Sequence, residues 1–142
     1  MIGVSTGNES TIKKEVFMKY QCAVIIDADL KKVTDAFLKL MIMNRTLSPG
    51  SETVFSYNMG EKEVVMKETI ESCDLPGELI VVYEIEGVWN RCVNRFSEED
   101  GKVAFTMESE FVFADDPEVN EEKFRNKTQE QMEYFKFFVE KK

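Results

Sequence analysis

The sequence predicts an α+β protein in which a curved antiparallel sheet wraps around one long C-terminal helix. Three observations favour this fold: residues 117–142 carry an amphipathic helical pattern, residues 11–26 alternate between apolar and polar side chains, and residues 53–114 contain further apolar runs joined by short turns. We expect residues 1–142 to form a single domain, because a chain of this length suits one hydrophobic core. Residues 1–10 are polar, and we expect them to be frayed.

The C-terminal helix is expected to bury one side. A period of 3.6 residues places seven side chains on one stripe: Phe124, Thr128, Gln131, Met132, Phe135, Phe138 and Val139. Asp116 and Pro117 suit the N-cap and the first helical position. Two members of the stripe, Thr128 and Gln131, are polar. Two interpretations of these residues stay open, because they either satisfy a polar group of a strand or loop, or line a pocket.

Two different spacings of apolar residues predict a first strand and a helix after it. Residues 11–26 predict a long strand, and its even-numbered side chains are the better candidates for the core. Asp29 is a candidate N-cap, and apolar residues at helical spacing follow it, which predicts a short helix over residues 30–40. Residues 40–47 predict a second short helix, which Ser48, Pro49 and Gly50 would end.

Five further strands are expected over residues 53–58, 61–73, 78–86, 88–97 and 102–114. The turns between them are short, and short turns restrict the register of the paired strands.

In the register that we expect for the last two strands, Lys102 pairs with Ser97, which places Glu108 beside Arg91 and Ser109 beside Asn90.

The earlier turns place Tyr83 beside Asn90, Glu68 beside Tyr83, and Lys67 beside Glu84. The outward face then gains neighbours of opposite charge, namely Lys67 with Glu84 and Arg91 with Glu108, as cross-strand pairing favours.

On the inward face this register gathers a transverse row of polar side chains among apolar ones: Glu68, Tyr83, Asn90 and Ser109, with Asn94 one step away. A buried carboxylate or amide without a partner costs about 1–3 kcal/mol, so these residues must bond to each other, to water or to a ligand. One interpretation is a closed structural network. We favour the other, a small-molecule pocket, because a few polar groups in an apolar concavity are typical of such sites.

The charge of the chain argues against two classes of partner. The formal net charge is −9, with 27 acidic and 18 basic residues and no run of Lys or Arg. A phosphate backbone or an anionic membrane would mostly be repelled. We therefore expect no nucleic-acid partner.

Several further absences restrict location and chemistry. The first residues lack the pattern of a signal peptide and no stretch is apolar enough to span a membrane, so we expect a cytoplasmic protein without a membrane span.

The three cysteines, Cys22, Cys73 and Cys92, have no CxxC spacing, and we expect them to be reduced. There is no histidine, which excludes His-based triads and His-ligated metals. We expect no metal and no cofactor.

Two stretches carry a resemblance to a known family. Residues 23–37, AVIIDADLKKVTDAF, resemble the strand, turn and first helix of the START/SRPBCC superfamily, and residues 96–103, FSEEDGKV, resemble a late hairpin of it. This superfamily includes the major birch-pollen allergen, aromatic polyketide cyclases and lipid-transfer START domains. The resemblance implies the helix-grip fold, which usually has seven strands, so a short edge strand could lie within residues 44–51.

The resemblance also implies a largely apolar cavity between the sheet and the C-terminal helix, where relatives hold hydrophobic ligands. Our leading hypothesis is a module that binds a small hydrophobic molecule, lipid-like or aromatic and polyketide-like. The ligand-binding residues that we predict are Glu68, Tyr83, Asn90, Asn94, Phe105, Met107, Ser109, Phe111, Phe124, Thr128, Gln131, Met132 and Phe135. The sequence does not indicate an oligomeric state.

Two alternatives belong to other functional classes. In an enzyme of cyclase or dehydratase type, Glu68 would act as the base and Tyr83 as the acid. The sequence holds no known catalytic motif, so we do not assign it as an enzyme. In a protein-interaction module like the co-chaperone branch of the superfamily, Trp89, Tyr134 and Phe137 would be contact residues.

Overall fold

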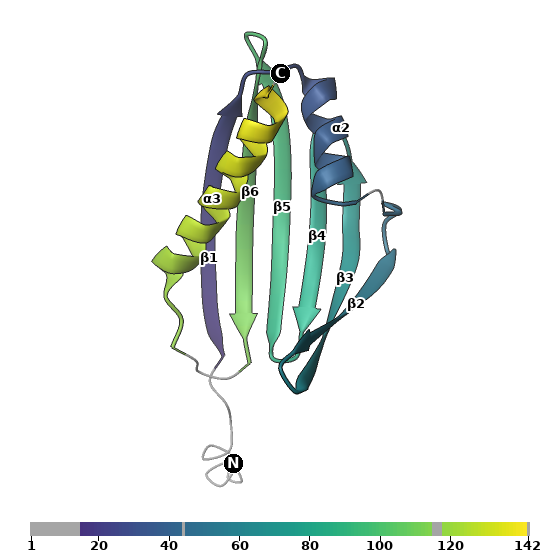
Figure 1. The fold of residues 1–142 in the computed structure, drawn as a ribbon, viewed down its shortest axis with the longest axis vertical. Helices are drawn as coiled ribbons and strands as arrows, with labels where there is room; N and C mark the ends of the chain where they lie inside the picture. The colour runs from purple at the N-terminus through teal and green to yellow at the C-terminus, as the bar shows by residue number, and fades with distance from the viewer. Residues whose placement is uncertain (1–14, 44, 115–117, 142) are drawn as a thin grey trace, which may run out of the picture.

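One antiparallel sheet and two helices make up the part of the chain that the structure describes. The structure is a computed structural model, and it describes residues 15–43, 45–114 and 118–141. The elements are β1 (Val16–Ile26), α2 (Leu30–Leu40), β2 (Glu52–Met59), β3 (Lys62–Asp74), β4 (Glu78–Ile85), β5 (Val88–Glu99), β6 (Lys102–Phe113) and α3 (Glu121–Glu140). Across the sheet the strands lie in the order β1-β6-β5-β4-β3-β2, and both helices lie on the same side of it (Figure 1).

The first strand follows the predicted alternation. All even-numbered residues of β1 from Met18 to Ile26 are buried, and the odd-numbered ones are exposed. β1 pairs with β6, although the two strands are far apart in the sequence. The sheet therefore brings its first and last strands together, and α3 lies mainly against β1 (Figure 1).

The segment after β1 forms fewer helical turns than the sequence predicts. Asp29 caps α2 as expected, because its side chain accepts a hydrogen bond from the backbone N–H of Lys32 at 2.8 Å. The second short helix expected over residues 40–47 is not formed by the described residues of that range. Met41 is the C-cap of α2, and Met43 has a positive φ of 54°, a conformation that ends a helix. Among the described residues of the range 44–51, none forms the seventh strand.

Helix α3 begins later than its pattern suggests. Its N-cap is Asn120, whose side chain accepts from the backbone N–H of Lys123 at 3.2 Å. The predicted cap, Asp116, and Pro117 lie outside the described residues. Met132, Phe135 and Val139 of the predicted stripe are buried. Phe138 and Gln131 are exposed, because the helix lies along the edge of the sheet rather than across its middle.

The predicted register is confirmed for two of the three hairpins that we paired. Glu68 is opposite Tyr83, and Tyr83 is opposite Asn90. The β5–β6 register is wrong by two residues, since Lys102 pairs with Glu99 instead of Ser97. The loop is the two-residue turn Asp100-Gly101, with φ of 53° and 76°, which suits a hairpin turn of type I′. A shift of two residues leaves every side chain on its predicted face.

One of the two predicted charge pairs forms. Lys67 Nζ lies 3.5 Å from Glu84 Oε1, as predicted. Arg91 is not opposite Glu108, and it binds Glu71 instead, with Nε–Oε1 and Nη2–Oε2 distances of 2.8 and 2.7 Å. The two-residue shift of the β5–β6 register places Arg91 opposite Glu110, and Glu71 lies at a β-bulge between Ile70 and Ser72.

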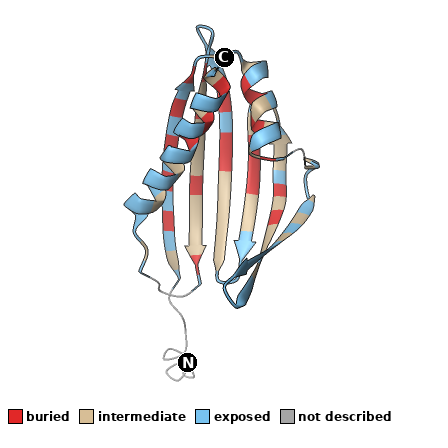
Figure 2. Ribbon diagram, viewed as in Figure 1, coloured by how far each residue is buried: buried red, intermediate tan, exposed pale blue. Residues whose placement is uncertain are grey.

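The hydrophobic core occupies the end of the sheet that the helices cover. Phe37 of α2 packs against Phe96, Phe105 and Phe135, with ring centroids 5.0, 5.6 and 6.1 Å away. Figure 2 shows the buried positions of β5 gathered toward this end, while the other half of the strand is only partly buried. In the described part of the chain, neither helix is long and apolar enough to cross a membrane.

Candidate functional site

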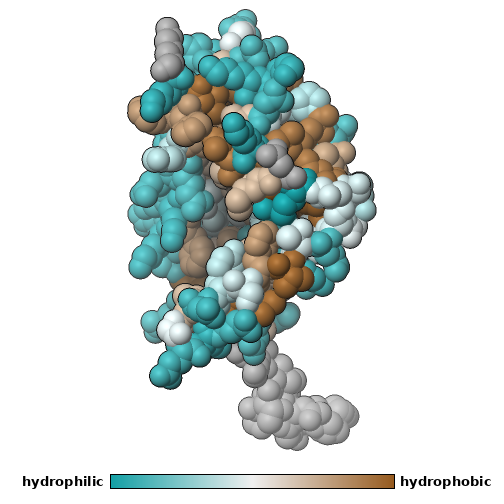
Figure 3. All heavy atoms as spheres, turned by 45° about the vertical axis from the view of Figure 1, so that its right-hand side comes forward, coloured by the Kyte–Doolittle hydropathy of each residue, from teal (hydrophilic) through white to brown (hydrophobic). Residues whose placement is uncertain are grey.

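A cavity of about 320 Å³ opens between the N-terminal half of α3 and the inner face of the sheet. Its lining comes from β1, β4, β5, β6, α3 and the end of α2: Tyr20, Met41, Tyr83, Asn90, Cys92, Met107, Ser109, Phe111, Phe124, Lys127, Thr128 and Gln131. Figure 3 shows a hollow in the face of the molecule beside α3, with apolar atoms inside it. The volume lies at the lower end of the range of small-molecule sites, about 300–1,000 Å³.

Eight of the residues predicted to bind a ligand line this cavity: Tyr83, Asn90, Met107, Ser109, Phe111, Phe124, Thr128 and Gln131. Thr128 and Gln131, the polar members of the helix stripe, thus face the same space as the polar residues of the sheet. Alternation along the strands placed the sheet residues on this face, and helical spacing placed the others opposite them.

Three other predicted residues, Phe105, Met132 and Phe135, belong to the core instead. Phe105 and Met132 are completely buried, and Phe105 packs against Phe96 with ring centroids 4.7 Å apart. They lie on the predicted face but at the end that α2 fills. The periodicity of a strand predicts a face, but it does not predict how far along that face a helix packs.

Glu68 is bound by an arginine that the sequence analysis did not single out. Its side chain is 2% exposed, and Arg45 donates to both carboxylate oxygens, with Nε–Oε1 and Nη2–Oε2 distances of 2.7 and 2.6 Å. The Arg45 guanidinium also lies over the ring of Phe55, 4.8 Å from its centroid. Glu68 is absent from the cavity lining. The ion pair stabilises the buried carboxylate without a ligand.

Tyr83 connects this ion pair to the cavity. Its pKa is raised well above the ordinary value, first because the phenol is buried and then because the Glu68 carboxylate lies beside it. Tyr83 therefore stays protonated at neutral pH. Tyr83 is opposite Glu68 in the sheet, and its side chain lines the cavity.

Side-chain hydrogen bonds form two groups on the cavity floor. In the first, Tyr20 Oη lies 2.8 Å from Thr128 Oγ1. In the second, Ser109 Oγ lies 3.7 Å from Cys92 Sγ.

The second group of hydrogen bonds continues from Cys92. Its thiol donates to Asn90 Oδ1 at 3.4 Å, and Asn90 Nδ2 donates to the carbonyl of Glu110 at 3.1 Å. Burial raises the pKa of the Cys92 thiol, so the thiol keeps the proton that it donates.

Asn94 lies next to the cavity and carries an unsatisfied acceptor. The residue is 4% exposed, pairs with Met107 in the sheet, and donates from Nδ2 to the carbonyl of Leu79 at 3.2 Å. Its Oδ1 has no hydrogen-bond partner among the described residues. Asn94 does not itself line the cavity, although Cys92 and Met107 beside it do.

Four lining residues were not predicted as ligand-binding: Tyr20, Met41, Cys92 and Lys127. Tyr20 and Cys92 lie on strand faces that the alternation already assigned to the interior. Lys127 follows Phe124 by three residues and precedes Gln131 by four, a spacing that places all three on one side of the helix. For Met41 and Arg45 the sequence offers no comparable signal, because the segment after α2 is irregular.

The mouth of the cavity is apolar. Met41 and Gln131 also line a smaller depression of about 250 Å³ between α2 and α3, together with Leu40, Tyr134, Phe135 and Phe138. Tyr134 is 71% exposed, and Phe138 is 50% exposed. Of the residues proposed for a protein-interaction module, Tyr134 and Phe137 are exposed and Trp89 is partly buried. Their role as contact residues stays a prediction.

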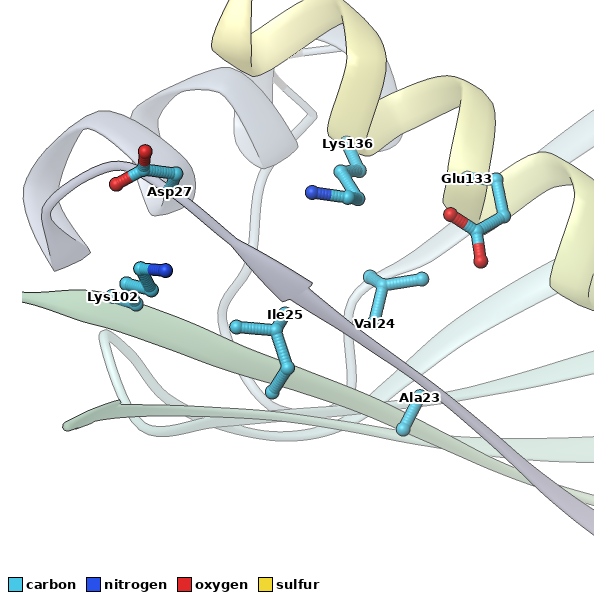
Figure 4. Close-up of a pocket in the computed structure, with 7 residues that line it drawn as sticks. All are labelled: Ala23, Val24, Ile25, Asp27, Lys102, Glu133 and Lys136. Carbon is cyan, nitrogen blue, oxygen red and sulfur yellow. The ribbon is translucent and has the colours of Figure 1, made fainter.

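A second hollow lies on the other side of α3, along the free edge of β1. Its volume is about 460 Å³, and it is lined by Ala23, Val24, Ile25, Asp27, Lys102, Glu133 and Lys136. Figure 4 shows the Glu133 and Lys136 side chains reaching from α3 toward β1. This groove contains none of the residues predicted to bind a ligand. Ion pairing occupies its polar groups in part, since Lys136 Nζ lies 2.6 Å from Glu140 Oε2.

Within residues 15–43, 45–114 and 118–141, no group of three or more His, Cys, Asp or Glu side chains is arranged to hold a metal ion.

No protein-family model and no curated protein matches the sequence, but several solved structures match the fold. Mll3558 from Rhizobium loti has a TM-score of 0.69 at 12% identity, and the match covers 84% of this chain and 95% of that one. Ara h 8.0201 has a TM-score of 0.66 at 12% identity, covering 87% of this chain and 98% of that one. CalU16 from Micromonospora echinospora has a TM-score of 0.51 at 15% identity, covering 89% and 82%.

At these identities the likeness establishes the fold alone. The shared features are the curved antiparallel sheet, the short helix α2 after β1 and the C-terminal helix α3. The chain has the helix-grip fold, as the sequence predicted.

Proposed function

We propose that this protein binds a small hydrophobic molecule in the cavity between the sheet and α3. The observation that carries the proposal is the composition of the lining. Methionine and aromatic side chains make up half of the lining residues, and polar side chains converge on the same space. Such a combination is typical of ligand sites, where apolar surface supplies affinity and placed polar groups orient the ligand.

The aromatic walls support this proposal. The ring centroid of Phe111 lies 5.4 Å from that of Phe124 and 6.1 Å from that of Tyr20, so strands β1 and β6 and helix α3 present rings to one space. Met41 and Met107 add adaptable apolar surface. Phe111, Phe124 and Met107 are only partly buried and pack against the core, so part of their surface is left to face the cavity.

The enzyme alternative is less well supported. A general base must reach the proton that it removes, but both oxygens of Glu68 accept from Arg45 and the residue does not line the cavity. Tyr83 would be a poor acid near neutral pH, because burial and Glu68 raise its pKa. We therefore favour binding over catalysis.

Titration with 1-aminoanthracene, a neutral fluorescent probe, would test the proposal. We expect saturable binding that Gln131→Trp weakens about ten-fold or more, because a bulky ring at the exposed mouth would block entry without burying a new side chain. Asn126→Trp is the matched control, since Asn126 is exposed on the same helix and does not line the cavity. It should leave the affinity within about two-fold.

Two outcomes would count against the binding function. One is the absence of saturable binding by the unaltered protein. The other is equal loss of affinity in both tryptophan variants, which would place the probe elsewhere or indicate a general effect on the helix. Thermal unfolding of both variants would identify the latter.

A further inference from the structure

We infer that the ligand is a linear amphiphile with an uncharged polar head, bound with its head on the cavity floor and its hydrocarbon chain in an outer groove between α2 and α3. The outer groove is the depression lined by Leu40, Met41, Gln131, Tyr134, Phe135 and Phe138. This inference rests on the proposed function. It adds to that function a second subsite and the class of ligand that would occupy both.

The outer groove continues the cavity. Helices α2 and α3 lie side by side over the same end of the sheet (Figure 1). Met41, at the end of α2, and Gln131, on α3, line both the cavity and the groove. The two spaces therefore meet beside these two side chains. A ligand too long for the cavity can leave it there and stay in contact with the protein.

The cavity and the groove differ in polarity. The cavity floor carries hydroxyl, thiol and amide groups, which belong to Tyr20, Tyr83, Asn90, Cys92, Ser109 and Thr128. The groove is walled by apolar side chains, apart from Gln131 at the junction and the hydroxyl of Tyr134. A ligand that fits both spaces must be polar at its inner end and apolar at its outer end, and this describes an amphiphile.

The floor favours a head that forms hydrogen bonds. Tyr20 and Ser109 are buried, and each hydroxyl can donate once and accept twice. The contacts of Tyr20 with Thr128 and of Ser109 with Cys92 use only part of that capacity. A methylene group placed there would leave the rest without a partner, which weakens binding. A hydroxyl or amide head can both donate and accept, so it fits whichever way the hydrogens of the floor point.

The floor does not favour a charged head. Of the described residues that line the cavity, only Lys127 is charged, and it is exposed to solvent at the rim. The buried charge of Arg45 is already balanced by Glu68. An ion on the floor would therefore lose its hydration without gaining a counter-charge. This favours an alcohol or an amide over a carboxylate.

The groove exposes large apolar side chains that a hydrocarbon chain would cover. Leu40, Tyr134 and Phe138 are all exposed, and they lie around one depression although they come from two helices. Apolar side chains that gather in one exposed patch often mark a binding site, whereas scattered ones are ordinary. A chain in the groove would remove part of this surface from water, and that burial would supply affinity.

The length of the chain decides whether the groove is used. Helix α3 is about 10 Å across with its side chains. An extended hydrocarbon chain advances about 1.25 Å per carbon, as C–C bonds of about 1.5 Å imply. A chain that starts on the floor therefore passes the helix after about eight carbons. A six-carbon alcohol should stay in the cavity, and a ten-carbon alcohol should reach the groove.

Calorimetric titration of the unaltered protein with 1-hexanol, 1-decanol and decanoate would test the head and the chain separately. We expect 1-decanol to bind about ten-fold or more tighter than 1-hexanol, because its additional methylenes lie in the groove. At about pH 8, where decanoate is ionised, 1-decanol should also bind about five-fold or more tighter than decanoate, because the floor offers no counter-charge.

Two phenylalanine variants then locate the chain. Phe138→Ser should lower the ratio of the 1-decanol affinity to the 1-hexanol affinity about five-fold, because it removes a wall of the groove that only the longer chain reaches. Phe137→Ser is the matched control, since Phe137 is exposed on the same helix and lines neither the cavity nor the groove. It should leave that ratio within about two-fold. Thermal unfolding of both variants would show that they remain folded.

The outcomes separate this inference from the proposed function. Tighter binding of decanoate than of 1-decanol would place the head at the rim beside Lys127 and overturn the inference. Equal effects of the two phenylalanine variants, or binding of 1-aminoanthracene without binding of any linear probe, would also overturn it. All three results would leave ligand binding intact. If neither 1-aminoanthracene nor any linear probe binds, both the inference and the proposed function are wrong.

Discussion

Arg45 decides what Glu68 does in this molecule. A carboxylate in an inward polar row could serve as a catalytic base, but the Arg45 guanidinium binds both of its oxygens through two hydrogen bonds. Both side chains are largely removed from water. The pair therefore anchors the segment after α2 to strand β3, and Glu68 contributes to stability rather than to the cavity surface.

Removing one partner of this pair should be costly. We expect Glu68→Gln to lower the free energy of unfolding in urea by about 3 kcal/mol or more, because it leaves the Arg45 charge buried without its counter-charge. Glu71→Gln is the matched control, since Glu71 binds Arg91 through the same two-bond geometry but at an exposed position. It should cost under about 1 kcal/mol. Equal losses in the two variants would refute a special role for the buried pair.

At the scale of elements, the ends of α3 and the turns between strands determine the architecture. Asn120 satisfies a backbone N–H that the first turn leaves unpaired, and Glu121 and Glu122 add negative charge where the helix dipole is positive. The start of α3 matters for the site, because its first half lines the cavity.

We expect Asn120→Ala to lower the free energy of unfolding by about 1 kcal/mol, the usual cost of a lost N-cap. Asn126→Ala should be neutral or slightly stabilising, because Asn126 is exposed in the helix interior, where alanine has the higher helix propensity. Urea unfolding of both variants would check this. If Asn120→Ala proved as mild as Asn126→Ala, the helix would not depend on this cap.

The sequence predicts where the helices and strands lie along the chain better than it predicts how they pair and how deeply their residues are buried. Alternation and turn residues predicted the strands, the faces and two of the three hairpin registers. The prediction of the β5–β6 register was wrong because the acidic run Glu98-Glu99-Asp100-Gly101 permits a loop of two or four residues. Only the backbone geometry distinguishes the two loops. The prediction of a second short helix was wrong because an apolar run does not reveal the left-handed backbone conformation at Met43.

The candidate site shows the same limit. Periodicity predicted the polar row and the opposing helix residues, and all of these residues except Glu68 and Asn94 line one cavity. It did not separate Phe105 from Met107, although the first lies in the core and the second lines the cavity. That difference depends on where α2 packs. The contact between Arg45 and Glu68 could not be predicted either, because Arg45 lies in an irregular segment and the two residues are 23 positions apart in the sequence.

For the molecule as a whole, burial of weak acids should make stability depend on alkaline pH. The pKa values of Cys92 and Tyr83 are raised above their ordinary values of 9.0 and 10.0, chiefly by burial. A raised pKa in the folded state means that the unfolded chain loses the proton first. The stabilising contribution is therefore complete below the ordinary value and declines as pH rises toward the folded pKa.

The free energy of unfolding should accordingly fall above about pH 9, by up to about 1.4 kcal/mol per pH unit for each such group. Cys92→Ala should reduce the slope between about pH 9 and 10, and Tyr83→Phe should reduce it above about pH 10. Tyr134→Phe, at an exposed position, should leave the slope unchanged. Urea unfolding at several pH values would measure these slopes, and identical slopes in all variants would contradict the prediction.

The core and the cavity divide the same elements between them. Along β6, Val103 and Phe105 are completely buried, whereas Met107 and Phe111 line the cavity, and α3 divides in the same way between Met132 and Thr128. Substitutions at the exposed lining residues Lys127 and Gln131 therefore leave the completely buried side chains of the core in place. Such a chain could change its ligand through successive single replacements while it remained folded at each step, which gives this architecture a wide evolutionary freedom.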